Sequence, residues 1–440
     1  MEKLLNPEAW HPEIDIKAYR FDNGLTLLVL PEHGLPIVSF QVHYAVGSRN
    51  ERPGITGISH LFEHMMFRGS KELGPEEFSQ VIQAKGGEVN AFTTSDNTSY
   101  YENLPAAHLE LAVRLEAERL VHLSLTQDNF ATEREVVRSE RKLRAVDSPL
   151  GLPLELLSAM AYTQHPYQWP ILGWDYDLRH LTLEDCLDYH RTYYNPANMV
   201  VVVSGDVEPE SAQEMVGRYF GTIPSPGPSP PIRAQESPQR GERRAIYKKV
   251  SQVEAFLAGF HVPSLKDPEI YAVLLLAAIL GEGKASRGYQ RFVRPGQAID
   301  LEVHLPPPPF AYQDPGLLLI IGLAAPGQPL SALEAEVWQE IAQIQEQGVT
   351  LEELNRVKKI MRAQYVKVLA NNFYRGLLSG MMHLKIGEAD LINRIPDLYD
   401  QVTLTDIQSA ARRYLTEDNR TVVIVKPVSE AENAALGPVD

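Results

Sequence analysis

The sequence is organised around the segment Gly57-Ile58-Ser59-His60-Leu61-Phe62-Glu63-His64-Met65-Met66-Phe67-Arg68-Gly69. In a helix, residues four apart project from one face about a turn apart, so the imidazoles of His60 and His64 can both reach one small cation. Glu63 lies three residues after His60 and shares that face, where its carboxylate can take a proton from a nearby water. The spacing predicts a metal site and a general base on one short helix.

The residues around these three side chains favour a buried helix. Apolar residues supply contacts with the core, namely Leu61, Phe62, Met65, Met66 and Phe67. Gly54 and Gly57 give the chain a flexible entry into the helix. Ser59 is expected to cap the first turn, and Gly69 is expected to end the helix. The competing interpretation is a buried helix that carries two incidental histidines.

Two histidines leave a catalytic zinc site incomplete, because such a site normally has three protein ligands and an open position. The single cysteine, Cys186, excludes an internal disulfide and a multi-cysteine metal site. Candidates for the third ligand lie in the acidic segment 131–142, which is expected to be a helix. Glu133 and Glu140 are seven residues apart and share a face, whereas Glu135 points away. From spacing alone, this charge run is equally well explained as a solvated helix face.

Length and charge limit the classes of protein to consider. A chain of 440 residues exceeds the usual size of one hydrophobic core, so two domains are expected. The formal charge of −16 repels phosphate backbones and argues against a nucleic-acid partner. The sequence shows no apolar run long enough for a signal peptide or a membrane span. We expect a cytoplasmic protein, or a periplasmic or organellar one if a leader has been removed.

A proline-rich stretch that begins at Pro224 divides the sequence. Proline removes backbone donors and favours an extended, solvated path. On either side the same residues recur at a constant offset of 221 positions: Thr182, Tyr193, Asn198, Val201 and Val202 reappear as Thr403, Tyr414, Asn419, Val422 and Val423. Duplication explains this constancy better than chance matching. The predicted domains are residues 1–223 and 243–440, joined by a linker over 224–242.

The pattern of elements in both halves indicates an α+β fold. Residues 25–30 and 37–46 form β-rich runs, and residues 107–122 and 332–347 show helical periodicity. Strands and helices are mixed without strict alternation, which favours antiparallel pairing. We expect two homologous domains, each an antiparallel-rich sheet with helices packed on one face.

The motif His-x-x-Glu-His resembles the signature of the pitrilysin-like zinc metallopeptidases, or inverzincins, and the chain is similar to bacterial two-domain relatives of mitochondrial processing peptidase. The similarity covers the segments 57–70, 86–93, 133–137 and 194–199. Family members take the third zinc ligand from a glutamate some seventy to eighty residues beyond the second histidine, and Glu140 lies 76 residues beyond His64. The resemblance therefore implies one zinc ion per chain, bound by His60, His64 and Glu140.

The resemblance also implies roles for two regions around the metal. Glu133 matches a second glutamate that assists the site, and is expected to orient the ligands from behind. The second half of the chain has no His-x-x-Glu-His motif. Its segment 274–287 resembles the helix and glycine-rich turn of the metal-free half in family members. That half is expected to be structural and to enclose the substrate.

The chemistry implied by the resemblance is that of a zinc metalloendopeptidase. A zinc-activated water attacks the peptide carbonyl, with Glu63 as the general base. Residues 86–101 are interpreted as one bent strand whose exposed edge pairs with the main chain of an extended or unfolded peptide. Asn90 and Ala91 are the expected contacts on that edge, together with Phe67. The alternative is that these are ordinary sheet residues, with Asn90 in a turn.

Family members also grip the substrate with an arginine and a tyrosine from the metal-free half or subunit. Arg375 lies in a comparable region, but no tyrosine follows it within its helix, since Met381, Met382 and His383 occupy the next two turns. We therefore expect a homo- or heterodimer with a related, possibly metal-free subunit. The alternatives are a non-catalytic core or assembly subunit of the same family, and a hydrolase that acts on something other than peptides.

Overall fold

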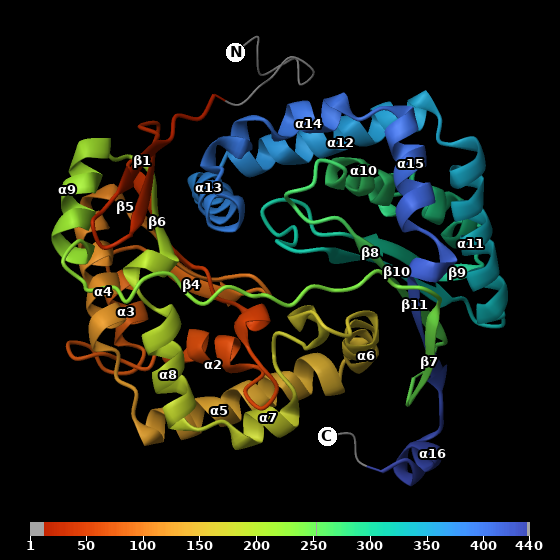
Figure 1. Ribbon diagram of the computed structural model, residues 1–440, viewed down its shortest axis with the longest axis horizontal. Helices are drawn as coiled ribbons and strands as arrows, with labels where there is room; N and C mark the ends of the chain where they lie inside the picture. The colour runs from red at the N-terminus through yellow and green to blue at the C-terminus, as the bar shows by residue number, and fades with distance from the viewer. Residues whose placement is uncertain (1–12, 252, 438–440) are drawn as a thin grey trace.

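The computed structural model describes residues 13–251 and 253–437, in two halves that lie side by side (Figure 1). The sheet of the first half contains β1 (Lys17–Arg20), β2 (Thr26–Pro31), β3 (Ile37–Tyr44), β4 (Glu88–Thr93), β5 (Thr98–Pro105) and β6 (Met199–Gly205). Within the described residues the strand order is β1-β2-β6-β3-β5-β4. Strands β2 and β6 pair in parallel, and the other neighbours are antiparallel. Strand β4 therefore lies at an edge of the sheet.

The sheet of the second half repeats this arrangement without a counterpart of β1. It contains β7 (Arg243–Lys249), β8 (Ala255–Val262), β9 (Ala298–His304), β10 (Gly316–Ala324) and β11 (Arg420–Pro427). In the described part of the chain the order is β7-β11-β8-β10-β9, with a parallel β7–β11 pair and antiparallel pairs elsewhere. The matching orders confirm two homologous, antiparallel-rich α+β domains.

The residues at the constant offset of 221 positions make the same local contacts in both halves. The hydroxyls of Thr182 and Thr403 cap helices α8 (Leu183–Tyr193) and α15 (Leu404–Tyr414) through equivalent capping boxes. The side-chain amide of Asn198 donates to the carbonyl of Tyr193 at 2.8 Å, and that of Asn419 donates to the carbonyl of Tyr414 at 2.7 Å. The repeat therefore extends to individual hydrogen bonds.

Each sheet is buried on both faces. Successive side chains of a strand point to opposite faces, so Leu27 and Val29 of β2 belong to one core and Leu28 and Leu30 to another. The outer face of the first sheet is covered by helices of its own half: α2 (Ile58–Met65), α3 (Glu77–Gln83), α4 (Leu109–His122), α5 (Gln127–Arg141), α8 and α9 (Pro209–Phe220). The short helix α7 (Asp175–His180) packs beside α5. The predicted packing of helices on one face is therefore confirmed for the outer face of this sheet.

The second sheet is covered on its outer face in the same way (Figure 1). Its helices are α10 (Ile270–Gly281), α11 (Leu330–Gln347), α12 (Leu351–Leu369), α14 (Ile395–Gln401) and α15, with α16 (Glu430–Ala435) near the end of the chain. Helix α10 is apolar around its whole circumference because Ile270 to Leu280 are all buried in this core. Among the described residues, no helix combines the length and the apolar character needed to cross a bilayer.

The inner face of each sheet is covered by a helix from the other half. Helix α13 (Asn372–Ile386) packs on β3 and β6 of the first sheet, and α6 (Gly151–Ala161) packs on β8 and β11 of the second. Gly376 and Gly380 bring α13 close to the first sheet, since an added Cβ would lie 2.7 Å from the side chain of Gln41 and 2.5 Å from that of His43. The two halves are therefore joined by exchanged helices.

The linker crosses between the halves without helix or strand (Figure 1). Its composition suggested a solvated path, but the linker also makes hydrogen bonds to the rest of the protein. The Glu236 carboxylate accepts backbone hydrogen bonds from Thr163, Gln164 and His165 at 2.9 to 3.0 Å. Further along, Gln239 donates to the carbonyl of Arg420 at 2.8 Å. The linker is therefore held against both halves.

Asp96 lies at the centre of a buried polar cluster between the halves. Its carboxylate accepts from Arg49 at 3.2 Å and from the backbone N–H of Gln313 at 3.0 Å, and it also bonds the Tyr167 hydroxyl. Lys385 of α13 lies 3.3 Å from the same carboxylate and donates to the carbonyls of residues 309 and 311. Burial lowers the pKa of Lys385, against the attraction of Asp96. The turn after β4 is thereby fixed to the second half.

We expect Lys385→Met to lower the free energy of unfolding by about 3 kcal/mol, because it removes one partner of a buried, hydrogen-bonded ion pair. The midpoint of urea denaturation provides the measurement. Lys142→Met is the matched control, since that side chain is 71% exposed beside Asp147. Equal midpoints for the two variants would contradict a stabilising role for the Asp96 cluster.

Candidate metal centre

The helix that carries the histidines begins at a glycine. Gly57 is its N-cap residue and has φ 88°, and a Cβ there would lie 2.7 Å from the carbonyl oxygen of Leu172. The prediction that Ser59 caps the helix is wrong. The buried Glu51 carboxylate accepts instead from the backbone N–H groups of Gly57 and Ser59, both at 2.8 Å. The Ser59 hydroxyl donates to the same carboxylate at 2.6 Å, and burial raises the pKa of Glu51 to about 8.

The end of this helix also differs from the expectation. Helix α2 ends at Met65, four residues before Gly69, although Gly69 has the positive φ of 101° typical of a chain reversal. The packing residues are as predicted, since Leu61, Phe62 and Met65 are fully buried in the core of the first half. The helix is therefore fixed through its apolar face, with its histidines left to face α5.

Helix α5 places Glu140 opposite both histidines. The Nε2 atoms of His60 and His64 lie 3.7 and 3.4 Å from Oε2 of Glu140. Among the described residues, these three form the one cluster of potential metal ligands, with their donor atoms all within 4.8 Å of one another. Two ligand atoms bound at about 2.1 Å to a tetrahedral zinc ion lie about 3.4 Å apart, so the two distances between Glu140 and the histidines fit such an ion.

Burial favours the uncharged form of one histidine in the cluster. It lowers the pKa of His60 to about 3, so the ring is neutral and can offer a lone pair to a metal at neutral pH. Burial acts in the same direction on His64, but its contact with Glu133 and the charges of Glu63 and Glu140 raise its pKa overall. Oε1 of Glu140 lies 2.9 Å from the Arg144 guanidinium, which leaves Oε2 for the histidines.

Glu63 lies beside the cluster and contacts β4. One of its carboxylate oxygens, Oε2, accepts a hydrogen bond from the Thr93 hydroxyl at 2.6 Å. Burial raises the pKa of Glu63 above its ordinary value, although Thr93 acts in the opposite direction. Thr93 was not among the predicted site residues, because no local pattern pairs the end of a strand with a helix thirty residues earlier. The contact holds Glu63 on the side of the edge strand.

Glu133 lies behind His64, as the resemblance implied. Its Oε2 is 3.2 Å from Nδ1 of His64, and its side chain is 2% exposed. Its Oε1 forms an ion pair with Arg68, a residue for which the sequence predicted no role. Glu135 points away from the cluster, with 54% of its side chain exposed beside Arg138. The three glutamates of α5 therefore face the sides that their spacing predicted.

The predicted substrate residues lie on and below the edge strand. Residues 86–101 are not one bent strand: β4 and β5 form a hairpin around a turn at residues 94–97. Asn90 and Ala91 lie within β4, so a turn at Asn90 is wrong, and the alternative that both are ordinary sheet residues stays open. Phe67 is partly buried, and its ring lies 6.2 Å from that of Tyr100 and 5.1 Å from the Arg119 guanidinium. Substrate contact by these residues stays a prediction.

Arg375 does not face an open space. Its guanidinium lies 2.7 Å from the Glu32 carboxylate and donates to the carbonyl of Leu369 at 2.6 Å. These contacts lie at the end of β2, where Arg375 helps to fix α13 to the first sheet. The region of the second half that matches α2 is the buried helix α10 and its glycine-rich turn, which carry no metal-ligand cluster within the described residues.

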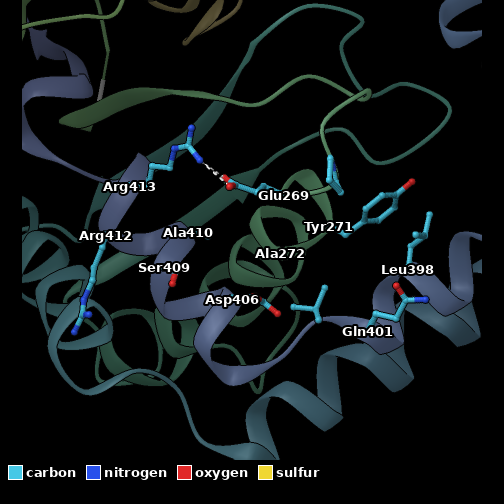
Figure 2. Close-up of a pocket in the computed structure, with 12 residues that line it drawn as sticks. Glu269, Tyr271, Ala272, Leu398, Gln401, Asp406, Ser409, Ala410, Arg412 and Arg413 are labelled. Carbon is cyan, nitrogen blue, oxygen red and sulfur yellow. Dashed lines mark hydrogen bonds and ion pairs between the residues drawn. The ribbon is translucent and has the colours of Figure 1, made fainter.

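A separate cavity of about 630 Å³ lies in the second half, between α10, α14 and α15 (Figure 2). Its walls include Tyr271, Ala272 and Leu398. At its rim Glu269 and Arg413 form an ion pair at 2.7 Å, which Figure 2 shows as a dashed line. None of the cluster residues lines this cavity, so it is not part of the candidate metal centre.

Comparison with known proteins places this geometry in a family. Residues 29–174 match the family described as Insulinase (Peptidase family M16), and residues 180–361 match the Peptidase M16 inactive domain. The zinc protease PqqE of Helicobacter pylori is 30% identical over 92% of this chain and 91% of its own length. The chain belongs to peptidase family M16. This confirms the resemblance to the pitrilysin-like zinc proteases.

Other M16 relatives are similar over nearly their whole length. An uncharacterized zinc protease of Bacillus subtilis, YmxG, is 27% identical over 93% of this chain and 98% of its own. The crystal structure of a protease from Helicobacter pylori superposes with a TM-score of 0.89 at 28% identity, covering 94% of this chain and all of that one. A putative M16-like peptidase from Alicyclobacillus acidocaldarius has a TM-score of 0.81 at 22% identity, covering 95% of this chain and all of that one, and supports the fold alone.

We expect Glu140→Gln to weaken zinc binding by more than about 100-fold, because even residues that only support a ligand contribute 10- to 100-fold. Competition with a zinc chelator, followed by metal analysis, measures the change. Glu135→Gln makes the same chemical change on the exposed side of α5 and should leave about one zinc per chain. If both variants retain zinc equally, Glu140 is not a ligand.

Proposed function

We propose that this M16 protein is a zinc metalloendopeptidase that cleaves extended or unfolded peptides. The observation that carries the proposal is the convergence of His60, His64 and Glu140 on one point, with the Glu63 carboxylate beside it. Two imidazole nitrogens and one carboxylate form the donor set expected of a catalytic zinc site with an open position. The names of the M16 relatives as zinc proteases support this reading.

The chain supplies the proton transfers of peptide hydrolysis. A bound zinc ion would lower the pKa of water and polarise the scissile carbonyl. Thr93 holds Oε2 of Glu63, which leaves Oε1 free to take the proton from the attacking water. The same carboxyl group can then give the proton to the leaving nitrogen, so no covalent intermediate with the protein is needed. Glu133 holds the His64 ring in place during these steps, and Glu140 would bind the metal together with the two histidines.

The edge strand supports an extended substrate. The free edge of β4 presents backbone donors and acceptors that a peptide can pair with as an added strand. Asn90 and Ala91 lie on this edge, and Thr93 connects its end to Glu63. Main-chain pairing makes few demands on sequence, so the proposed substrate class is defined by its extended backbone.

We expect Glu63→Gln to keep about one zinc per chain and to lower peptide cleavage by about 10²- to 10⁴-fold, because it removes the general base. Cleavage of an unstructured peptide mixture, read by fragment sequencing, measures the rate, with Glu135→Gln as the control. Unchanged cleavage in Glu63→Gln would overturn the proposed mechanism. Zinc bound by an unmodified protein that cleaves nothing would favour the non-catalytic subunit.

A second subunit is proposed to complete the active chamber. Arg375 is held by Glu32, so the second half does not offer it to a substrate. The fold also occurs in the longer periplasmic protease PqqL of Escherichia coli, where 97% of this chain matches 50% of that chain with a TM-score of 0.75. That match, at 17% identity, supports the fold alone. The proposed partner is a related, metal-free subunit.

We expect a monomeric fraction, isolated by size-exclusion chromatography, to cleave peptides at least about tenfold more slowly than a dimeric fraction, since an incomplete chamber positions substrate poorly. Rates are compared at equal zinc content. Equal rates per chain in the two fractions would show that one chain is sufficient.

A further inference from the structure

Arg68 follows α2 closely and reaches the helix that faces it. It lies four residues after His64, and its side chain is 24% exposed. One guanidinium nitrogen, Nη2, forms an ion pair with Oε1 of Glu133. The other, Nη1, lies 3.2 Å from the Glu76 carboxylate on the solvent side. The guanidinium therefore connects a buried carboxylate of the metal centre with the surface.

Glu133 divides its two oxygens between Arg68 and His64. Oε1 faces Arg68, and Oε2 lies 3.2 Å from Nδ1 of His64. With Nε2 of His64 given to a zinc ion beside Glu140, Nδ1 would carry the hydrogen and donate to Glu133. A carboxylate held at one oxygen has its other oxygen fixed in direction. Arg68 thus sets where Glu133 meets the imidazole.

The backbone of Arg68 makes a second connection to the same helix. Its carbonyl accepts a hydrogen bond at 3.0 Å from the side-chain amide of Asn129, in the first turn of α5. Side chain and backbone of one residue therefore both connect the end of α2 with α5. Because α2 carries the histidines and α5 carries Glu140, these contacts act on the separation of the ligands.

The two histidines differ in this support. Nδ1 of His60 is buried and has no hydrogen-bond partner among the described residues, whereas Nδ1 of His64 contacts Glu133. The orientation of the His60 ring therefore depends on packing, and that of His64 depends on a polar chain that ends at Arg68. Removing Arg68 leaves the buried Glu133 carboxylate free to rotate away from His64.

We propose that Arg68 is a positioning residue of the zinc site, which acts on His64 through Glu133. The proposal rests on the proposed function, since it takes His64 as a zinc ligand. It assigns no chemical step to Arg68. Replacing Arg68 is therefore expected to lower the zinc affinity only when Glu133 is present.

Zinc affinity in a double-mutant cycle tests this proposal. Dissociation constants for zinc are measured by chelator competition for the unsubstituted protein, for Arg68→Gln, for Glu133→Gln and for the double variant. The melting temperature of each zinc-free protein is measured as well. We expect about a tenfold loss for each single variant, as for other residues that orient a ligand. The double variant should lose no more zinc affinity than the single variant that binds zinc less tightly, because both changes break the same chain of contacts. Arg68→Lys, which keeps the cation, should recover part of the loss.

Arg138→Gln is the matched control. This arginine lies on α5 with 28% of its side chain exposed, but its partners are Glu135 and Asp175. It should leave zinc affinity unchanged. Additive losses in the double variant, or a loss that follows the zinc-free melting temperature across all variants, would overturn the positioning role. Zinc binding that survives His64→Ala would instead overturn the proposed function, so the two failures are distinguishable.

Discussion

The crossing of α2 and α5 is the constraint on which the candidate site depends. The histidines of α2 are about 6 Å apart along their helix, and the two inward glutamates of α5 are about 10.5 Å apart along theirs. This difference lets α5 place Glu140 at the Nε2 atoms and Glu133 at the far side of His64. Both helices are anchored in one core, through Phe62 of α2 and Phe130 of α5. The metal centre is thus a product of apolar packing.

The sequence predicted the parts of the site that local spacing encodes. The shared face of His60, Glu63 and His64 follows from helical geometry alone. Glu140 could be chosen only by family resemblance, because the 75 residues between His64 and Glu140 do not encode how two helices cross. Ser59 was mistaken for the cap for a related reason: the acceptor is Glu51, a buried carboxylate that reaches back to the helix from outside its first turn.

In the fold, too, local patterns were predictable from the sequence and long-range contacts were not. The constant offset of 221 positions predicted the duplication, and the elements 25–30, 37–46, 107–122 and 332–347 were recognised because their periodicity is local. The hairpin of β4 and β5 was taken for one strand, since its turn is formed by Thr94 and Asn97 bonding each other without a glycine. Its neighbour Asp96 is held by the second half, a contact that no pattern within residues 86–101 contains.

The exchange of α6 and α13 has a consequence for how such a chain could arise. Either half alone would expose an apolar sheet face, formed in the first half by Leu28, Leu30, Val200 and Val202. A half-length ancestor could not have been a stable monomer with that face uncovered. It would have buried the face by trading one helix with a second copy of itself, as in a domain-swapped dimer. Fusion of the two genes would then have made a pre-existing symmetric pair permanent.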